Sequence, residues 1–181
     1  MKIFLTKLPD VKIFQPQIFV DHRGFFLETF RDEWFDLKHD WLQDNHSRSN
    51  RGVLRGMHFQ TIPGQAKLVR CARGKIIDVV VDLRRGSPTY KKSIQVVLDE
   101  QNQKMIYVPV GFAHGFVVIS KEADVFYRCS SYYDPKTEKG VAYNDPDLNI
   151  KWPDIKLIVS ERDKTNPFFS EIADEIPFIY G

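Results

Sequence analysis

The sequence predicts an all-β fold, an antiparallel sandwich or barrel with short peripheral helices. Between residues 53 and 129, short runs of β-favouring residues alternate with turn signals, and no helical pattern intervenes. Aromatic residues make up 13% of the chain, a composition that suits a core built between sheet layers. The predicted strands are Val53–Gln60, Lys67–Ala72, Lys75–Leu83, Tyr90–Leu98, Lys104–Val108, Phe116–Ser120 and Ala123–Cys129.

A length of 181 residues fits one domain, with two segments flanking the predicted barrel. The first is an N-terminal arm of about residues 1–30. It contains an edge-strand pattern over Val11–Val20 and an aromatic strand over Phe25–Phe30. The best helical pattern of the first half follows at Asp32–His39. The second segment, about residues 134–181, is rich in Asp, Pro and Asn and is expected to form loops and short helices.

Charge and hydropathy limit the classes of partner. The chain has 26 Lys and Arg against 24 Asp and Glu, so its net charge of +2 does not favour a nucleic-acid or membrane surface. It has no apolar run of ~20 residues, and its N-terminus lacks the pattern of a signal peptide. Cys71 and Cys129 lie within apolar strand patterns, which indicates buried, reduced thiols. These features predict a soluble, cytoplasmic protein.

Two stretches resemble the paired motifs of the cupins, which fold as jelly-roll barrels. Gly52, five further residues and His58 match the first motif, and a Pro-x-Gly-x-x-His pattern ending at His114 matches the second. Metal-binding cupins carry a further histidine and a glutamate where this chain has Gln60 and Lys67. A lysine ammonium repels a metal ion, and two histidines fall short of the three protein ligands usual at a catalytic site. The sequence therefore predicts a cupin-type jelly-roll barrel with no bound metal and no cofactor.

The substitutions leave a histidine, a cation and hydrogen-bond donors where a metal would sit. This is the equipment for removing a proton next to a carbonyl group and stabilising the resulting enolate.

A set of motifs in a fixed order then carries a closer resemblance, which runs from about Lys7 to Asp163. The chain resembles the dTDP-4-dehydrorhamnose 3,5-epimerases. The matching motifs are Asp21–Glu28, Gln43–Ser47, Gly52–Gln60, Lys67–Cys71, Pro109–Phe116 and Tyr127 with Tyr132 and Tyr133. The resemblance implies inversion of C3 and C5 in dTDP-4-keto-6-deoxy-D-glucose, giving dTDP-4-keto-L-rhamnose. It also implies a homodimer in which an N-terminal strand, here within Val11–Phe30, crosses to the partner.

Four catalytic residues follow from the resemblance. His58 would remove the protons at C3 and C5, and Asp163 would fix the imidazole tautomer. Lys67 would polarise the C4 carbonyl, and Tyr127 would return a proton from the opposite face of the sugar. The residues alone also allow a core histidine, an exposed tail acid, a solvated lysine and a buried structural tyrosine.

The resemblance also implies a set of substrate-binding residues. Arginines would clamp the diphosphate, polar side chains would bond the nucleotide and sugar, and one phenylalanine would contact the thymine. In the proposed dimer, Arg23, Phe26 and Glu28 would reach the partner's pocket. The expected binding residues are Arg23, Phe26, Glu28, Gln43, Asp44, Asn45, Arg55, His114, Glu138 and Arg162. His46 and Ser47 could instead support the residues that touch the substrate.

One conflict lies inside the motif Gly52–Gln60. Strict strand alternation puts Arg55 and His58 on opposite faces, yet both should reach one cavity. Gly56 lies between them, so a β-bulge at this glycine is expected to re-aim one side chain.

Other functions remain open from the sequence. A related epimerase could invert C3 or C5 alone with the same base and acid. A cupin oxygenase could hold iron through His58 and His114. A nucleotide-sugar binding module without catalysis is the third alternative.

Overall fold

The structure is a computed structural model that describes residues 1–35 and 40–181. Its strands are β1 (Lys2–Leu5), β2 (Lys12–Gln15), β3 (Ile18–Asp21), β4 (Gly24–Leu27), β5 (Gln43–Asn50), β6 (Val53–Gln60), β7 (Lys67–Arg73), β8 (Lys75–Asp82), β9 (Ser93–Asp99), β10 (Met105–Val108), β11 (Phe112–Val118), β12 (Glu122–Cys129), β13 (Glu138–Gly140) and β14 (Ile158–Val159). The helices are the 3₁₀ turns η1 (Asp32–Trp34) and η2 (Ala173–Glu175) and the α-helices α1 (Glu161–Lys164) and α2 (Phe169–Ile172).

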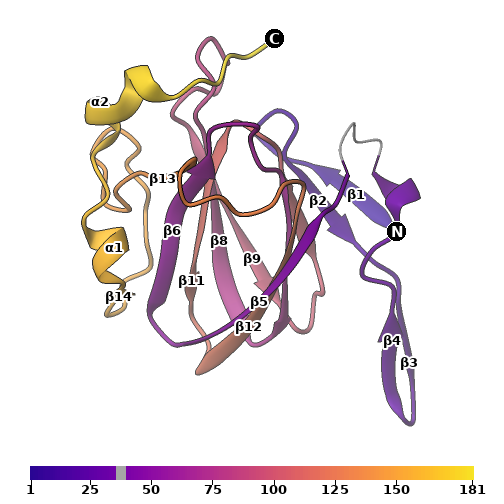
Figure 1. Cartoon of the computed structure of the whole chain (residues 1–181). Helices are drawn as coiled ribbons and strands as arrows, with labels where there is room; N and C mark the ends of the chain where they lie inside the picture. The colour runs from indigo at the N-terminus through magenta and orange to yellow at the C-terminus, as the bar shows by residue number, and fades with distance from the viewer. Residues whose placement is uncertain (36–39) are drawn as a thin grey trace.

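Two sheets face each other and form a jelly-roll barrel (Figure 1), which confirms the predicted fold class. One sheet has the order β1-β2-β10-β7-β12-β5, and the other has the order β13-β6-β11-β8-β9. The pairings between the described strands are antiparallel except for β14, which runs parallel to β6; an isolated bridge between Arg85 and Ile179 is also parallel. This arrangement puts β6 and β12, which carry two of the predicted catalytic residues, in opposite walls of the barrel.

Apolar side chains fill three layers. The barrel interior holds residues such as Val69, Ile76 and Val125. On the outer face of β6, β8 and β11, a second cluster buries Phe59 and Phe169 beneath the C-terminal tail. A third cluster lies outside β7 and β10. Both sheets therefore bury apolar residues on two faces, which is why their strands read as nearly continuous apolar runs.

The predicted strands match the observed ones with three informative differences. Strand β5 has the polar sequence QDNHSRSN and was not predicted, because its inward side chains line a polar cavity and leave no hydrophobic alternation. Strand β11 begins at Phe112 rather than Phe116, directly after the turn residues Pro109–Gly111. Strand β9 begins at Ser93 rather than Tyr90, because Lys91 has a φ of 64° and belongs to a turn.

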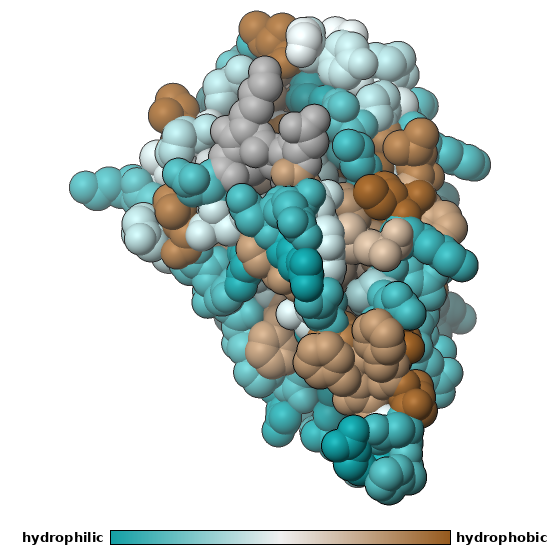
Figure 2. Space-filling view, turned by 90° about the vertical axis from the view of Figure 1, so that its right-hand side faces the viewer, coloured by the Kyte–Doolittle hydropathy of each residue, from teal (hydrophilic) through white to brown (hydrophobic). Residues whose placement is uncertain are grey.

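The N-terminal arm divides at Pro16. Strand β2 joins the barrel sheet, whereas β3 and β4 form a separate hairpin that projects away from it (Figure 1). Phe25 and Phe26 are 61% and 64% exposed on this hairpin. Figure 2 shows apolar side chains gathered on this side of the molecule, above a polar tip. A single chain thus leaves aromatic surface uncovered, a feature typical of interaction sites.

The segment after the hairpin departs from the predicted pattern. The aromatic strand expected over Phe25–Phe30 ends at Leu27, and Phe30 packs against Phe35 with their ring centroids 5.6 Å apart. The helix expected at Asp32–His39 is represented by the 3₁₀ turn η1, and its last four positions lie outside the described residues.

The tail forms loops, short strands and the short helices α1 and α2, as the sequence predicts for the loops and helices. Cys71 and Cys129 are buried free thiols, as expected. Among the described helices, none has both the length and the apolar character that a membrane crossing requires.

Candidate active site

A β-bulge brings Arg55 and His58 to the same side of β6. In the pairing with β11, Phe116 faces Arg55 and His114 faces His58, so two steps along β11 correspond to three along β6. The extra residue lies next to Gly56, whose φ is 130°. A Cβ atom at Gly56 would lie 2.6 Å from the Cα of Gly115, so the close approach requires glycine here. The predicted bulge is confirmed, and it resolves the conflict in strand parity.

The opposite wall presents two aligned rows of inward side chains from the adjacent strands β7, β12 and β5. Lys67 pairs with Cys129, which pairs with Gln43. Two residues further along, Tyr127 pairs with Asn45 in the same way. Because side chains on neighbouring strands at paired positions share a face, the register gathers these polar groups at one end of the barrel interior.

Between the two walls lies a cavity of about 610 Å³. All four predicted catalytic residues and six of the ten predicted binding residues line it. They are His58, Lys67, Tyr127, Asp163, Gln43, Asn45, Arg55, His114, Glu138 and Arg162. Segments as distant in sequence as β5 and α1 therefore meet in one polar site.

His58 and Asp163 form a hydrogen-bonded pair at the base of this cavity. The Nε2 atom of His58 lies 2.7 Å from an Asp163 carboxylate oxygen. Burial raises the pKa of Asp163, but the hydrogen bonds from His58, the Gly56 N–H and Ser160 outweigh it and hold that pKa below its ordinary value. Asp163 is thus an ionised acceptor that orients the ring and leaves Nδ1 available to a ligand.

Helix α1 places the carboxylate. Ser160 is the N-cap residue, and its Oγ accepts a hydrogen bond from the Asp163 backbone N–H at 3.1 Å. The bulge contributes as well, because the Gly56 N–H donates to the other Asp163 oxygen at 3.4 Å. The alternative reading of Asp163 as an exposed tail acid is excluded by its exposure of 4%.

Lys67 and Tyr127 occupy the facing wall. Burial lowers the pKa of Lys67, while the charges of Cys129, Glu138 and Asp78 oppose that shift. Burial raises the pKa of Tyr127, which keeps its phenol protonated and able to donate a proton. Tyr127 lies on the inward row, so its place in the fold separates it from Tyr132, which is 67% exposed.

His114, opposite His58 on β11, has its own carboxylate. Its Nε2 lies 2.8 Å from an Asp78 oxygen, and both residues are buried. The cavity therefore contains two imidazoles on directly paired positions, each bonded to an aspartate on its far side.

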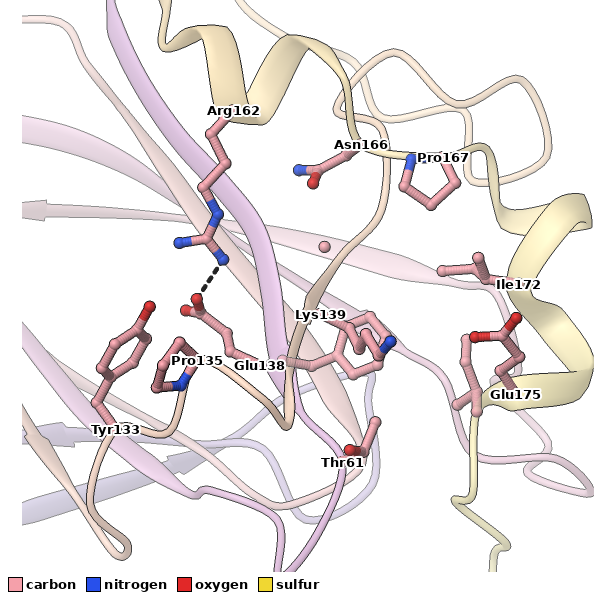
Figure 3. A pocket seen from close by; sticks show the side chains of 13 residues that line it. Thr61, Tyr133, Pro135, Glu138, Lys139, Arg162, Asn166, Pro167, Ile172 and Glu175 are labelled. Atoms are coloured by element: carbon pink, nitrogen blue, oxygen red, sulfur yellow. Dashed lines mark hydrogen bonds and ion pairs between the residues drawn. The ribbon is translucent and has the colours of Figure 1, made fainter.

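The rim of the cavity carries an ion pair between Arg162 and Glu138 (Figure 3). Behind this pair lies a second hollow of about 640 Å³, which shares Tyr133, Glu138 and Arg162 with the first. In the lining of the first cavity, the Gln43 side chain donates to Asn45 at 2.9 Å and accepts from the Tyr133 N–H at 2.9 Å. Charged and amide groups thus surround the mouth.

Four predicted binding residues lie outside this cavity. Arg23, Phe26 and Glu28 belong to the projecting arm, where Arg23 pairs with Asp21 and Glu28 with Arg31. Asp44 lies on the outer face of β5 and pairs with Arg128 at 2.7 Å. The expectation that Asp44 shares the site with its neighbours is wrong for this cavity, because alternation turns it away.

The structure adds cavity residues that the sequence did not single out as ligand-binding. Ser47 and Cys129 lie two positions from Asn45 and Tyr127, so strand parity would have identified them. Tyr133 and Gln65 come from loops, where no periodicity predicts orientation. Within residues 1–35 and 40–181, no group of three His, Cys, Asp or Glu side chains could hold a metal ion.

Comparison with known proteins now decides the family. The sequence profile described as dTDP-4-dehydrorhamnose 3,5-epimerase matches residues 5–171. The chain belongs to the dTDP-4-dehydrorhamnose 3,5-epimerase family. Members named as such include a Shigella flexneri protein that is 44% identical over 90% of this chain and 93% of its own length.

Two further relatives extend the comparison within the epimerase family. A Neisseria gonorrhoeae 3,5-epimerase is 50% identical over 84% of this chain, and the match spans 48% of that longer protein. The crystal structure of a Legionella pneumophila 3,5-epimerase in complex with dTDP-4-keto-L-rhamnose superposes with a TM-score of 0.96. It shares 39% sequence identity and the match covers 99% of this chain and 98% of the other. The epimerase fold is thus present over nearly the whole chain.

Proposed function

We infer that this chain is an epimerase that inverts C3 and C5 of dTDP-4-keto-6-deoxy-D-glucose and forms dTDP-4-keto-L-rhamnose for dTDP-L-rhamnose biosynthesis. The observation that carries this function is the pairing of His58 with Asp163 in a cavity faced by Lys67 and Tyr127. A base, a cation and a proton donor are the groups needed to remove and return a proton next to a carbonyl.

The two walls of the barrel supply the opposed faces that inversion requires. His58 projects from β6, and Tyr127 projects from β12 in the facing sheet. His58 would remove the proton from one side of the sugar, which leaves an enolate with its charge on the C4 oxygen. Lys67 would stabilise that charge, and Tyr127 would protonate the carbon from the other side. Repetition at the second carbon completes the reaction without a cofactor.

The same proposal assigns the remaining polar groups to the substrate's nucleotide part. Arg55 and Arg162 would bind diphosphate oxygens through their guanidinium groups. Gln43, Asn45 and Glu138 would hydrogen-bond the nucleotide and sugar, since all three line the cavity. Arg162 would exchange its ion pair with Glu138 for the diphosphate.

The proposal includes a homodimer with exchanged N-terminal arms. The β3–β4 hairpin leaves the barrel with exposed phenylalanines, and the Arg23 side chain at its tip is 78% exposed. In a two-fold dimer the hairpin would cover the partner's cavity mouth and bring Arg23, Phe26 and Glu28 to its substrate. The two free, buried cysteines support a cytoplasmic location, where thiols stay reduced.

The test is incubation with the 4-keto sugar nucleotide in deuterated water. Deuterium should enter both C3 and C5, and His58→Ala should abolish exchange while dTDP binding persists. His46→Ala is a matched control: His46 also bonds an aspartate, Asp124, at 2.9 Å, but it lies outside the cavity. This control should exchange deuterium at nearly the wild-type rate.

Each alternative predicts a different result, the first two in the exchange experiment and the third in an assay of oxygen consumption. Incorporation at one carbon only would indicate a single-position epimerase. Binding of the sugar nucleotide without exchange at either carbon would sink the epimerase assignment and leave a binding module. Oxygen consumption that depends on added iron would indicate an oxygenase.

A further inference from the structure

Asp78 is a buried carboxylate in the wall of the candidate active site that the chemistry described above does not use. It lies on β8, opposite Phe116 of β11, and His114 is two residues away on β11. The two side chains therefore share the inner face of adjacent strands at diagonal positions, a separation that the ring of His114 can span. The Asp78 Oδ2 atom accepts a hydrogen bond from His114 Nε2 at 2.8 Å.

The burial of Asp78 is complete and its bonding is incomplete. Its exposure is 0%, and within the described residues its Oδ1 atom has no hydrogen-bond partner. Asp82, four residues along β8, is equally buried but accepts hydrogen bonds from Arg84, Ser87 and Thr89. Buried polar atoms are normally satisfied, so an aspartate held with a free oxygen calls for a functional explanation.

The hydrogen bond fixes which part of His114 meets the cavity. Because Nε2 is directed to Asp78, Nδ1 is the ring nitrogen left for a ligand in the cavity that His114 lines. The same geometry holds at His58, where Nε2 is directed to Asp163 and Nδ1 remains. His58 and His114 face each other across the β6–β11 pair. The sugar would thus meet the Nδ1 atoms of two imidazoles, each of which has its Nε2 atom bonded to an aspartate.

The two carboxylates differ in their surroundings. Asp163 has hydrogen bonds from a backbone N–H and from His58, and its pKa is lowered overall despite burial. Burial raises the pKa of Asp78. The hydrogen bond and charge of His114 and the charge of Lys67 offset this increase only in part. The pKa values of these two carboxylates are thus shifted in opposite directions, although each aspartate bonds a histidine that lines the same cavity, which indicates different duties.

We propose, given the epimerase function inferred above, that Asp78 is a positioning residue: its carboxylate holds His114 with Nε2–H directed away from the cavity and Nδ1 directed at the sugar. Asp78 itself lines no part of the cavity and acts on the reaction through His114. It thus serves His114 as Asp163 serves His58.

A double-mutant cycle tests this role. Asp78→Asn should lower kcat roughly 10- to 100-fold, the range for loss of a hydrogen bond to a charged group, with a smaller change in KM. In a His114→Ala background the same substitution should change kcat by less than about twofold, because the group through which it acts is absent. Equal losses in both backgrounds would overturn the proposal.

Asp82→Asn is the matched control, because it also removes a fully buried carboxylate from β8. Asp82→Asn should lower the melting temperature without lowering kcat. If the role of Asp78 were purely structural, Asp78→Asn would have the same effect. A wild-type enzyme that does not turn over the 4-keto sugar would contradict the proposed function and leave the role of Asp78 to the following measurement.

That measurement is the ¹⁵N spectrum of histidine-labelled wild-type protein without substrate, with His114→Ala used to assign the signals. Nε2 of His114 should carry a proton, and Asp78→Asn should shift its resonance. An unprotonated Nε2 in the wild-type protein would refute the positioning role even if the substituted protein failed to fold.

Discussion

Within residues 1–35 and 40–181, three histidines bond an aspartate through Nε2, and their surroundings separate their duties. The nitrogen-to-oxygen distances are 2.9 Å at His46, 2.7 Å at His58 and 2.8 Å at His114. His46 stacks on Phe126 outside the cavity, whereas the other two line it. The histidine–aspartate pair therefore recurs in this fold, and it can take part in proton transfer only where a ligand can reach Nδ1.

At the residue scale, Asp163→Asn should lower kcat roughly 100-fold or more, with a much smaller change in KM. The amide keeps the shape of the carboxylate but loses the charge that orients and strengthens the base. Steady-state rates of epimer formation check this. Asp145→Asn, which removes another buried carboxylate, should reduce stability and leave kcat near the wild-type value. A normal kcat for Asp163→Asn would contradict the role of His58 as a base oriented by Asp163.

Asp82 gives a prediction about stability and pH. Burial raises its pKa, but hydrogen bonds from Arg84, Ser87 and Thr89 outweigh this and the pKa in the folded state is lowered. Because the pKa is lower in the folded state, the ionised carboxylate stabilises the fold at pH values above its ordinary pKa of about 3.9. This contribution is lost as the pH falls through the pKa of the folded state.

Asp82→Asn should therefore be less stable than the wild type at neutral pH, by about 3 kcal/mol, the cost of breaking a buried ion pair. The difference should narrow as the pH falls below about 4, since the wild-type carboxylate then becomes protonated. Urea unfolding across the acid range measures it. A difference that stays constant with pH would show that the ionised state of Asp82 contributes nothing.

At the scale of the element, one extra residue in β6 decides which side chains meet. Without the bulge, the residue opposite His114 would be Met57, and His58 would point to the outer apolar layer. Bulges of this kind re-aim side chains beside active sites. The strand itself was predictable from its pattern, and the bulge was predictable from the demand that two polar residues share a cavity.

Gly56→Ala tests this element, with Gly86→Ala as its control. Both glycines have positive φ, of 130° and 82°, but a Cβ at Gly86 meets nothing within 4 Å, whereas a Cβ at Gly56 meets the backbone of Gly115 at 2.6 Å. Gly86→Ala should cost about 1–2 kcal/mol for its backbone angle alone. Gly56→Ala should cost clearly more and abolish turnover, because the clash displaces His58 or Arg55. Thermal unfolding and epimerase assays compare them; equal losses would remove the argument for close approach.

At the scale of the whole molecule, the hairpin β3–β4 forms a two-stranded sheet of its own, separate from the two barrel sheets. The projection of this hairpin from the barrel (Figure 1) and the exposure of Phe25, Phe26 and Arg23 support an arm that functions on a second copy. The proposed exchange makes the two active sites depend on both chains.

Mixing two inactive variants tests that dependence. An Arg23→Ala chain paired with a His58→Ala chain would contain one complete site, made of His58 from the first and Arg23 from the second. Random reassociation should restore activity to about a quarter of the wild-type sites, as expected for a two-fold dimer. The mixture is denatured and refolded together, and separately refolded variants serve as the control. No recovery, in a preparation that forms dimers, would show that Arg23 serves its own chain or none.

The sequence by itself determined most of the barrel strands, the replacement of two metal ligands by Gln60 and Lys67, and most of the motif residues that line the cavity. These features depend on residue type and spacing over short stretches. Tertiary structure decided the orientation of Asp44, the partner of His114 and the strand β5, whose polar pattern hides its place in the barrel. Register between distant strands sets these outcomes, because a side chain's surroundings depend on which strands lie beside it.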